Sequence, residues 1–141
     1  MITEAVILNL STKGFCDIID ISGEVEKIVY RSGVRDGLCT VFVPGSTAGV
    51  TTIEAEPGVM QDLRNAIERL APQDMKYNHD ARWGDGNGFS HVRAALLGPG
   101  LSIPVKDKQL VNGTWQQVVL ADFDNRPRER RVVVQVLGEA G

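Results

Sequence analysis

The chain has few cysteines and histidines, the residues on which disulfide-rich and zinc-ribbon domains depend. It contains only 2 cysteines and 2 histidines among 141 residues. Cys16 and Cys39 lie far apart and form no Cys-x-x-Cys pair, which excludes a zinc ribbon and a thioredoxin-type redox site. Cys39 falls in the apolar run 38–43, where a buried and unreactive thiol is expected. Nothing in this pattern indicates an oxidising compartment, so we expect a cytoplasmic location.

Long apolar runs and an excess of basic charge are also missing. No run approaches the roughly 18 residues of a membrane helix, and no basic segment precedes an apolar one at the amino terminus. We therefore expect no signal peptide and no membrane partner. The net charge of −3 argues against non-specific nucleic-acid binding. The one basic cluster is expected to be the solvated start of a strand, with a phosphate or subunit contact as the alternative; it comprises Arg126, Arg128, Arg130 and Arg131.

The remaining composition, 43% hydrophobic and 23% charged, is that of a globular protein. The length fits one domain over residues 1–141. Apolar spacing predicts a helix from an N-cap at Ser22 to Gly33, a second from Pro57 to Pro72, and a short third over 90–97. The apolar stripe of the first is Ile21, Val25, Ile28 and Val29, and that of the second is Val59, Leu63, Ala66, Ile67 and Leu70. Strands are predicted over 3–11, 38–44, 49–55, 101–105, 113–123 and 130–137, with an extended piece at 15–19. No regular βαβ alternation is present, so the predicted class is α+β, a largely antiparallel sheet packed with two to three helices.

Residues 73–90 are polar and rich in glycine, and they predict a long ordered loop of the kind that is usually functional. Both histidines, His79 and His91, flank it. The loop between them carries Asp80, Asp85 and Asn87, and the two histidines could close on one divalent metal ion such as zinc, because two imidazoles and a carboxylate form a known ligand set. The alternative is two unrelated polar histidines, since their spacing matches no standard zinc motif.

Three further segments are candidates for chemistry. Glu54 ends a predicted strand and is either a general base or metal ligand, or a solvated residue or cap. The small residues 45–47 join two strands and form either an ordinary turn or a loop whose amides bind an oxyanion or phosphate. Residues 114–117 begin a predicted strand on which Trp115 and Gln117 share one face; an edge or subunit interface is the simpler interpretation, and a substrate pocket the alternative. No dinucleotide fingerprint is present, so no organic cofactor is expected.

These segments follow one another in a fixed order. They are Val43-Pro44-Gly45-Ser46-Thr47-Ala48-Gly49-Val50, Ile53-Glu54-x-Glu56-Pro57, Tyr77-Asn78-His79-Asp80, Asp85-Gly86-Asn87, His91-Val92-Arg93-Ala94-Ala95-Leu96-Leu97-Gly98-Pro99, Ile103-Pro104-Val105 and Leu110-x-x-Gly113-Thr114-Trp115-Gln116. Over nearly the whole chain this set resembles the YjbQ family, also called UPF0047 or the secondary thiamine-phosphate synthase family.

The resemblance implies an α+β domain that assembles as a homotrimer and has a pocket of histidines and acidic residues with a metal ion. The family name implies a small-molecule enzyme in which a hydroxymethylpyrimidine diphosphate condenses with a thiazole phosphate and releases pyrophosphate. On the matching positions, the catalytic residues would be Glu54, His79 and His91, and the metal ligands His79, His91 and Asp80. Residues that would bind the small phosphorylated substrate are Gly45, Ser46, Thr47, Asn87, Thr114, Trp115 and Gln116.

One departure from the family pattern bears on the chemistry. Many members have a histidine directly after the Val-Pro pair, where this chain has Gly45. A three-histidine metal site is therefore excluded within this chain, and Gly45 instead leaves room for a ligand near the backbone of Ser46 and Thr47. The missing histidine favours a second hypothesis, a non-catalytic ligand-binding or assembly module. A third is a metal-dependent phosphate-ester hydrolase.

Overall fold

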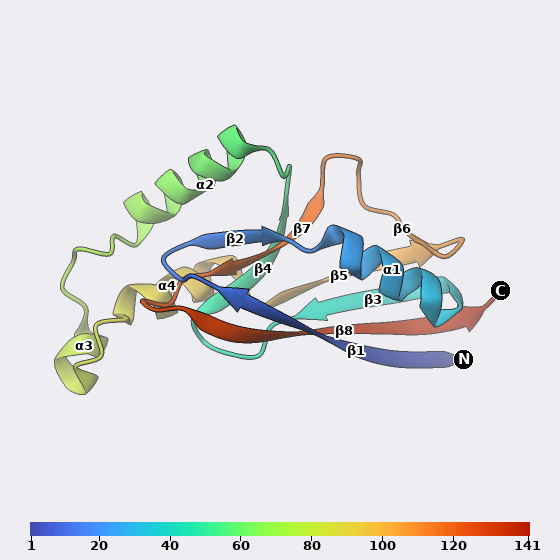
Figure 1. Ribbon diagram of the computed structural model, residues 1–141, viewed down its shortest axis with the longest axis horizontal. Helices are drawn as coiled ribbons and strands as arrows, with labels where there is room; N and C mark the ends of the chain where they lie inside the picture. The colour runs from blue at the N-terminus through green and yellow to red at the C-terminus, as the bar shows by residue number, and fades with distance from the viewer.

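The computed structural model describes residues 1–141 and contains eight strands and four helices (Figure 1). In chain order these are β1 (Ile2–Thr12), β2 (Asp17–Asp20), α1 (Ser22–Ser32), β3 (Val34–Phe42), β4 (Ala48–Ile53), α2 (Pro57–Leu70), α3 (Asn78–Trp83), α4 (Gly88–Leu97), β5 (Gly100–Lys106), β6 (Gln109–Leu110), β7 (Gln117–Asp122) and β8 (Arg128–Ala140).

The strands form two antiparallel sheets. The large sheet has the order β1-β8-β3-β5-β6, and the small sheet has the order β2-β7-β4. The longest pairing joins β1 to β8, from Ile2 opposite Gly138 to Thr12 opposite Arg128. Because all pairings are antiparallel and the helices are few, the predicted α+β class is confirmed.

The small sheet is the middle layer of the molecule. Alternate residues of β7 point to opposite faces, so Val118 and Leu120 pack with α1 and the large sheet in one core cluster. Val119 and Ala121 pack on the other face, in a second cluster that includes residues of α2 and α4. This double burial explains why β7 is a continuous apolar run rather than an alternating one.

Helix α1 covers the first cluster as its spacing predicts. All four residues of the predicted apolar stripe are buried: Ile21, Val25, Ile28 and Val29. Gly33 ends the helix in the left-handed conformation, with φ of 77°. The predicted N-cap at Ser22 is wrong, because the cap residue is Ile21 and the Ser22 hydroxyl instead accepts a hydrogen bond from the backbone N–H of Val118.

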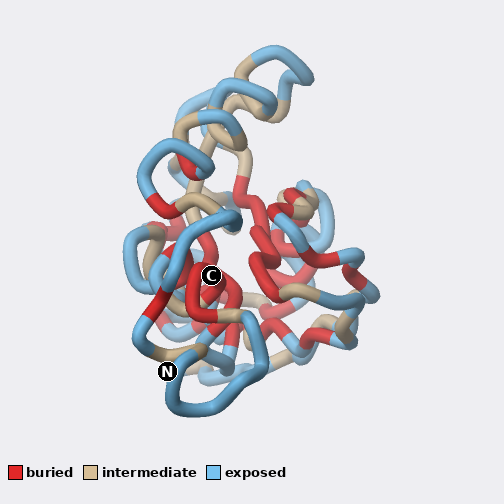
Figure 2. The backbone as a smooth tube through the Cα atoms, turned by 90° about the vertical axis from the view of Figure 1, so that its left-hand side faces the viewer, coloured by how far each residue is buried: buried red, intermediate tan, exposed pale blue.

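Helix α2 begins at Pro57 as predicted, and the carboxylate of Glu56 caps it by accepting hydrogen bonds from two backbone N–H groups. Only Ile67 of this helix is buried, and Leu70, predicted as part of its apolar stripe, is 69% exposed. Figure 1 shows the helix at the edge of the molecule, and in Figure 2 the buried stretches gather toward the middle of the tube. None of the four helices combines the length and apolarity needed to cross a membrane.

The prediction of one long loop over residues 73–90 is wrong. The segment contains the short helix α3 and the first turn of α4. Tyr77 is buried, and its hydroxyl donates a hydrogen bond to the carbonyl of Pro72, while Asp80 accepts one from the backbone N–H of Gly88. These contacts hold the segment in a defined conformation. Its helical turns were not predicted because the segment is polar and rich in glycine.

The prediction of a strand over residues 113–123 is wrong at its start. Residues 113–116 form a turn, closed by a hydrogen bond from the N–H of Gln116 to the carbonyl of Gly113. Strand β7 begins only at Gln117. Trp115 and Gln117 therefore do not share one face of a strand, contrary to the prediction. The short strand β6 was not predicted at all, since two residues carry no periodicity.

The layered core predicts a large difference between two leucine-to-alanine variants. Leu120 lies in the middle layer with no solvent exposure, so Leu120→Ala is expected to lower the free energy of unfolding by about 2–5 kcal/mol. Leu70→Ala, at an exposed position, is the matched control and is expected to change it by less than about 0.5 kcal/mol. Urea unfolding followed by circular dichroism measures both; equal effects would contradict the layering.

Candidate functional site

The candidate site lies where two connections cross between the large and the small sheet. Residues 43–47 link β3 to β4, and residues 123–127 link β7 to β8. The segment from α3 to α4 lies against them, with the Asn125 side chain donating a 2.9 Å hydrogen bond to the carbonyl of Asp85. The cavity here, of about 380 Å³, is called the crossover pocket and is lined by Gly45, Ser46, Thr47, His79, Trp83, Asp85, Asn87, His91, Asp124, Arg128 and Arg130.

The base of the pocket is a buried ion pair. Arg130 donates from Nε to Asp122 Oδ2 at 2.6 Å and from Nη2 to Asp122 Oδ1 at 2.9 Å, a two-pronged geometry that fits a carboxylate. Arg130 is 4% exposed and Asp122 is fully buried. The prediction that the arginine cluster is solvated is therefore wrong for Arg130, because the alternation of β8 turns this residue inward.

A second carboxylate, Asp124, extends the network toward the pocket opening. One of its oxygens accepts hydrogen bonds from Thr47 Oγ1 and Arg128, and the other accepts from Asn87 and the N–H of Asn125. Burial raises the pKa of Asp124, but these hydrogen bonds outweigh it and hold the pKa below its ordinary value.

The pKa of Asp122 is set in the same way. Burial raises it, whereas hydrogen bonds from Arg130, from the hydroxyl of Thr12 and from the N–H of Asp124 lower it further than burial raises it. Both carboxylates are therefore ionised at neutral pH and balance the two arginines.

The two histidines meet on the wall of the pocket, with ring centroids 4.5 Å apart. His79 Nδ1 lies 3.3 Å from Asp80 Oδ1 and 3.4 Å from Asp85 Oδ1, so two carboxylates hold its ring. The ring of His91 has no hydrogen-bond or ion-pair partner in the chain. The structure places the two imidazoles together, in different surroundings.

The donor set on this wall fits a divalent transition metal. Ligand atoms of His79, Asp80 and Asp85 all lie within 4.8 Å of one another. An imidazole and two carboxylates, beside a second imidazole, match the preferences of zinc or manganese. Compared with the predicted ligands His79, His91 and Asp80, the structure adds Asp85 and places His91 next to the cluster rather than within it.

Four predicted residues lie elsewhere in the chain. Glu54 follows the far end of β4, where Ile53 pairs with Gln117, whereas the pocket is at the other end, where Ala48 pairs with Asp122. Five residues of strand separate these ends by about 17 Å. The structure therefore does not bring Glu54 or the turn residues 114–116 to the histidines within one chain.

The turn residues have their own surroundings. Trp115 is 69% exposed, and Gln116 lines a separate hollow of about 320 Å³ with Thr52 and Asn112 among its other residues. Sequence analysis also missed Asp124, which lines the pocket, and Asp122, which pairs with Arg130 beneath it. The available signal was a pair of carboxylates at alternate positions directly after an apolar run, followed by arginines at alternate positions 128 and 130.

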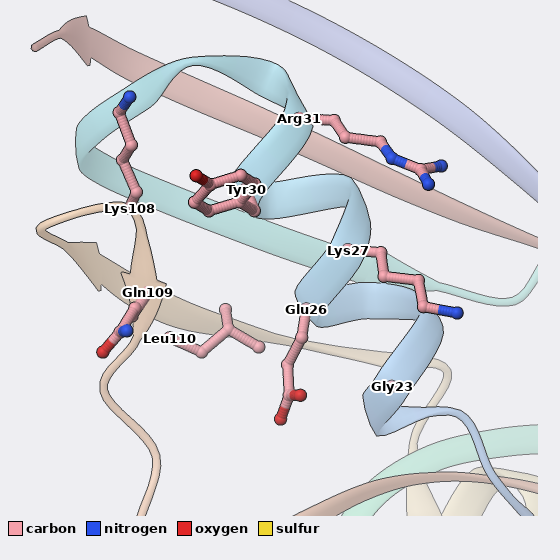
Figure 3. Close-up of a pocket in the computed structure, with 8 residues that line it drawn as sticks. All are labelled: Gly23, Glu26, Lys27, Tyr30, Arg31, Lys108, Gln109 and Leu110. Carbon is pink, nitrogen blue, oxygen red and sulfur yellow. The ribbon is translucent and has the colours of Figure 1, made fainter.

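The largest hollow in the molecule, about 730 Å³, lies on the outer side of α1 against β6 (Figure 3). Its lining residues are Gly23, Glu26, Lys27, Tyr30, Arg31, Lys108, Gln109 and Leu110. Tyr30 is 68% exposed, and the Lys108 ammonium lies 5.9 Å from the centre of its ring. No buried charged group or histidine faces this hollow, so the crossover pocket is the better candidate for chemistry.

The fold and the pocket define a class: an α+β protein of two antiparallel sheets with a polar, histidine- and arginine-lined pocket at their crossover. A family model described as UPF0047 protein YjbQ-like matches residues 6–139, and the chain belongs to this family. The resemblance inferred from the sequence motifs is thereby confirmed.

Relatives agree with this assignment. A UPF0047 protein of Archaeoglobus fulgidus is 38% identical over 130 residues, which cover 92% of this chain and 98% of the relative. The crystal structure of a YbjQ-like protein of unknown function from Sulfolobus solfataricus P2 superposes with a TM-score of 0.88 at 32% identity, covering 97% of this chain and 99% of that one. A hypothetical protein from Aeropyrum pernix K1 gives 0.89 at 32% identity, with coverages of 96% and 99%.

The buried ion pair predicts acid sensitivity. Because the folded-state pKa of Asp122 lies below the unfolded value of about 3.9, its stabilisation is present above that pH and is lost as the pH falls through the folded pKa. Asp122→Asn leaves Arg130 buried without its counter-charge, and we expect a loss of about 3–5 kcal/mol at pH 7.

Urea unfolding at pH 7 and pH 3 measures both effects. Asp62→Asn, on the exposed side of α2, is the control and is expected to stay within about 0.5 kcal/mol of the unmodified protein. An Asp122→Asn variant as stable as the unmodified protein at pH 7 would contradict the role given to the ion pair.

Proposed function

We propose that the chain is a small-molecule enzyme that binds a phosphorylated substrate in the crossover pocket. The observation that carries the proposal is the convergence of two imidazoles, 4.5 Å apart, with two arginines on one cavity of about 380 Å³. Arginines bind phosphate groups, and an imidazole transfers protons near neutral pH. A cavity of this size fits a small metabolite rather than a macromolecule.

His79, Asp80 and Asp85 are proposed to hold a divalent cation such as zinc. The support is the closeness of their ligand atoms and the fit of the donor set. When bound there, such an ion neutralises charge on a phosphate or a pyrophosphate leaving group. Asp80 also accepts the N–H of Gly88 at 2.9 Å, which fixes one carboxylate of the cluster to the start of α4.

His91 is proposed to be the proton carrier. Its ring lies beside that of His79 but is not engaged by any carboxylate, so both of its nitrogens are available to a ligand. Glu54 has no part in this one-chain site, because it lies at the far end of β4.

The reaction that the family name suggests fits these groups. The ring nitrogen of a thiazole phosphate supplies the electron pair of a new C–N bond to the pyrimidine methylene. The C–O bond to the diphosphate breaks, and its electron pair leaves with pyrophosphate. Within the pocket, Arg128 and Arg130 stabilise the negative charge that develops on the leaving group, and His91 donates a proton to it.

Two histidine variants separate the proposed roles. His91→Gln is expected to lower the rate of pyrophosphate release at least 100-fold while retaining bound metal, because it removes only the proton carrier. His79→Gln is expected to lose the metal as well, because it removes a ligand. Elemental analysis per chain and a coupled pyrophosphate assay with the pyrimidine diphosphate and thiazole phosphate measure these quantities.

The outcomes distinguish the rival functions. Full turnover by His91→Gln would remove this residue from the mechanism. Release of inorganic phosphate from phosphate esters, with no condensation, would favour a metal-dependent hydrolase. Ligand binding without turnover of either substrate would favour a binding module.

We also propose that the chain forms a homotrimer through the open face of the large sheet. The strand registers place eleven uncharged residues in adjacent rows of this face: Thr3, Ala5, Ile7, Leu38, Thr40, Phe42, Ser102, Pro104, Val133, Gln135 and Leu137. Ile7, Leu38, Phe42 and Leu137 are each at least 40% exposed in the single chain. A row of exposed apolar side chains without charge is typical of a surface that is covered in the assembly.

Light scattering tests the assembly. The unmodified protein is expected to have three times the 15.3 kDa mass of the chain, and Leu137→Glu is expected to reduce it to the chain mass by placing a charge in the covered face. Leu70→Glu, at an exposed position on α2, is the matched control and should leave the mass unchanged. A monomeric unmodified protein would refute the trimer.

A further inference from the structure

We infer that the loop of residues 45–47 and the guanidinium of Arg130 form a subsite for a phosphate or pyrophosphate group. The inference deepens the proposed function, on which it rests for the identity of the substrate. The subsite itself is defined by donors that the folded chain leaves unused at the base of the crossover pocket.

The first of these donors is Arg130 Nη1. Arg130 is 4% exposed, and its Nε and Nη2 are engaged with Asp122 and Thr47, but Nη1 has no hydrogen-bond partner in the chain. The only partnerless side-chain atoms fully sealed from solvent are those of Asn87 and Ser90, so Nη1 keeps an opening to solvent. A buried, charged donor with a free NH2 group facing a cavity is suited to an anionic ligand.

The second set of donors is in the loop itself. The backbone N–H groups of Gly45, Ser46 and Thr47 find no acceptor in the chain. All three residues line the same pocket as Arg130. Free backbone amides and a guanidinium are donors of the kind that bind phosphate oxygens.

Because Gly45 has no side chain, it leaves Arg130 Nη1 uncovered beside the loop amides. A Cβ at this position would lie 3.0 Å from Arg130 Nη1, and the backbone φ of 133° lies in the region that favours glycine. A side chain here would therefore cover the free guanidinium nitrogen. Gly45, which stands where many members of the family have a histidine, therefore also leaves Arg130 Nη1 accessible.

The neighbouring carboxylates do not repel the ligand as free charges would. Asp122 is occupied by Arg130, Thr12 and a backbone N–H group. Asp124 is occupied on both oxygens, by Thr47 and Arg128 on one and by amide groups on the other. These two carboxylates and the two arginines balance in charge, and the remaining carboxylate of the pocket lining, Asp85, lies beside His79 in the proposed cation site. The unused N–H groups supply the attraction for the anion.

The experiment uses pyrophosphate and inorganic phosphate as probes, at constant ionic strength. Calorimetry is expected to detect pyrophosphate binding to the unmodified protein and an affinity at least about tenfold lower for Gly45→Ala, because the added Cβ covers Arg130 Nη1. Gly98→Ala is the matched control. It also lies at positive φ, 93°, but its Cβ would meet no atom within 4 Å, so its affinity is expected to be unchanged.

A second measurement needs no variant. In nitrogen-15 NMR spectra of the unmodified protein, pyrophosphate should shift the amides of residues 45–47 and the side-chain resonance of Arg130. Shifts confined to other regions, or equal binding by Gly45→Ala and the unmodified protein, would overturn the subsite. Binding here without turnover would leave the subsite in place and remove the proposed reaction, whereas turnover without these shifts would remove the subsite alone.

Discussion

The buried pairing of Arg130 with Asp122 is the interaction on which the rest of the site depends. It joins the start of β8 in the large sheet to the end of β7 in the small sheet, at the point where the chain crosses between them. A charge pair of this burial is retained only when its geometry and remaining hydrogen bonds are good, and here both oxygens of the carboxylate are engaged.

The same pairing fixes the surrounding loops. Arg130 also donates to the hydroxyl of Thr47, and Thr47 in turn donates to Asp124, so the loop after β3 and the loop after β7 are held by one network. Asn87 ties the segment before α4 to Asp124 as well. The network therefore helps to bring the histidine wall and the glycine loop into the lining of one cavity, although they are distant in sequence.

The class of the fold followed from the sequence because it leaves local signals, and the sequence also offered the meeting of the two histidines, beside the alternative that they are unrelated. The apolar spacing of α1 and the ordered motifs around His79 and His91 are of this kind. The arginine network leaves only a weak signal in the sequence. Whether the side chain of Arg130 faces the core depends on a strand register set by β1 and β3, which lie more than 80 residues away in the chain. The family resemblance grouped Glu54 with the histidines, but the length of β4 separates them within one chain.

The central claim is that the crossover pocket binds a phosphate group between the histidine wall and Arg130. A crystal structure of the protein grown with pyrophosphate, without sulfate or phosphate in the medium, tests it most directly. The account predicts the anion within hydrogen-bond distance of Arg130 Nη1 and of an amide of residues 45–47. Pyrophosphate bound elsewhere, for example in the hollow between α1 and β6, with the crossover pocket holding only water, would contradict it.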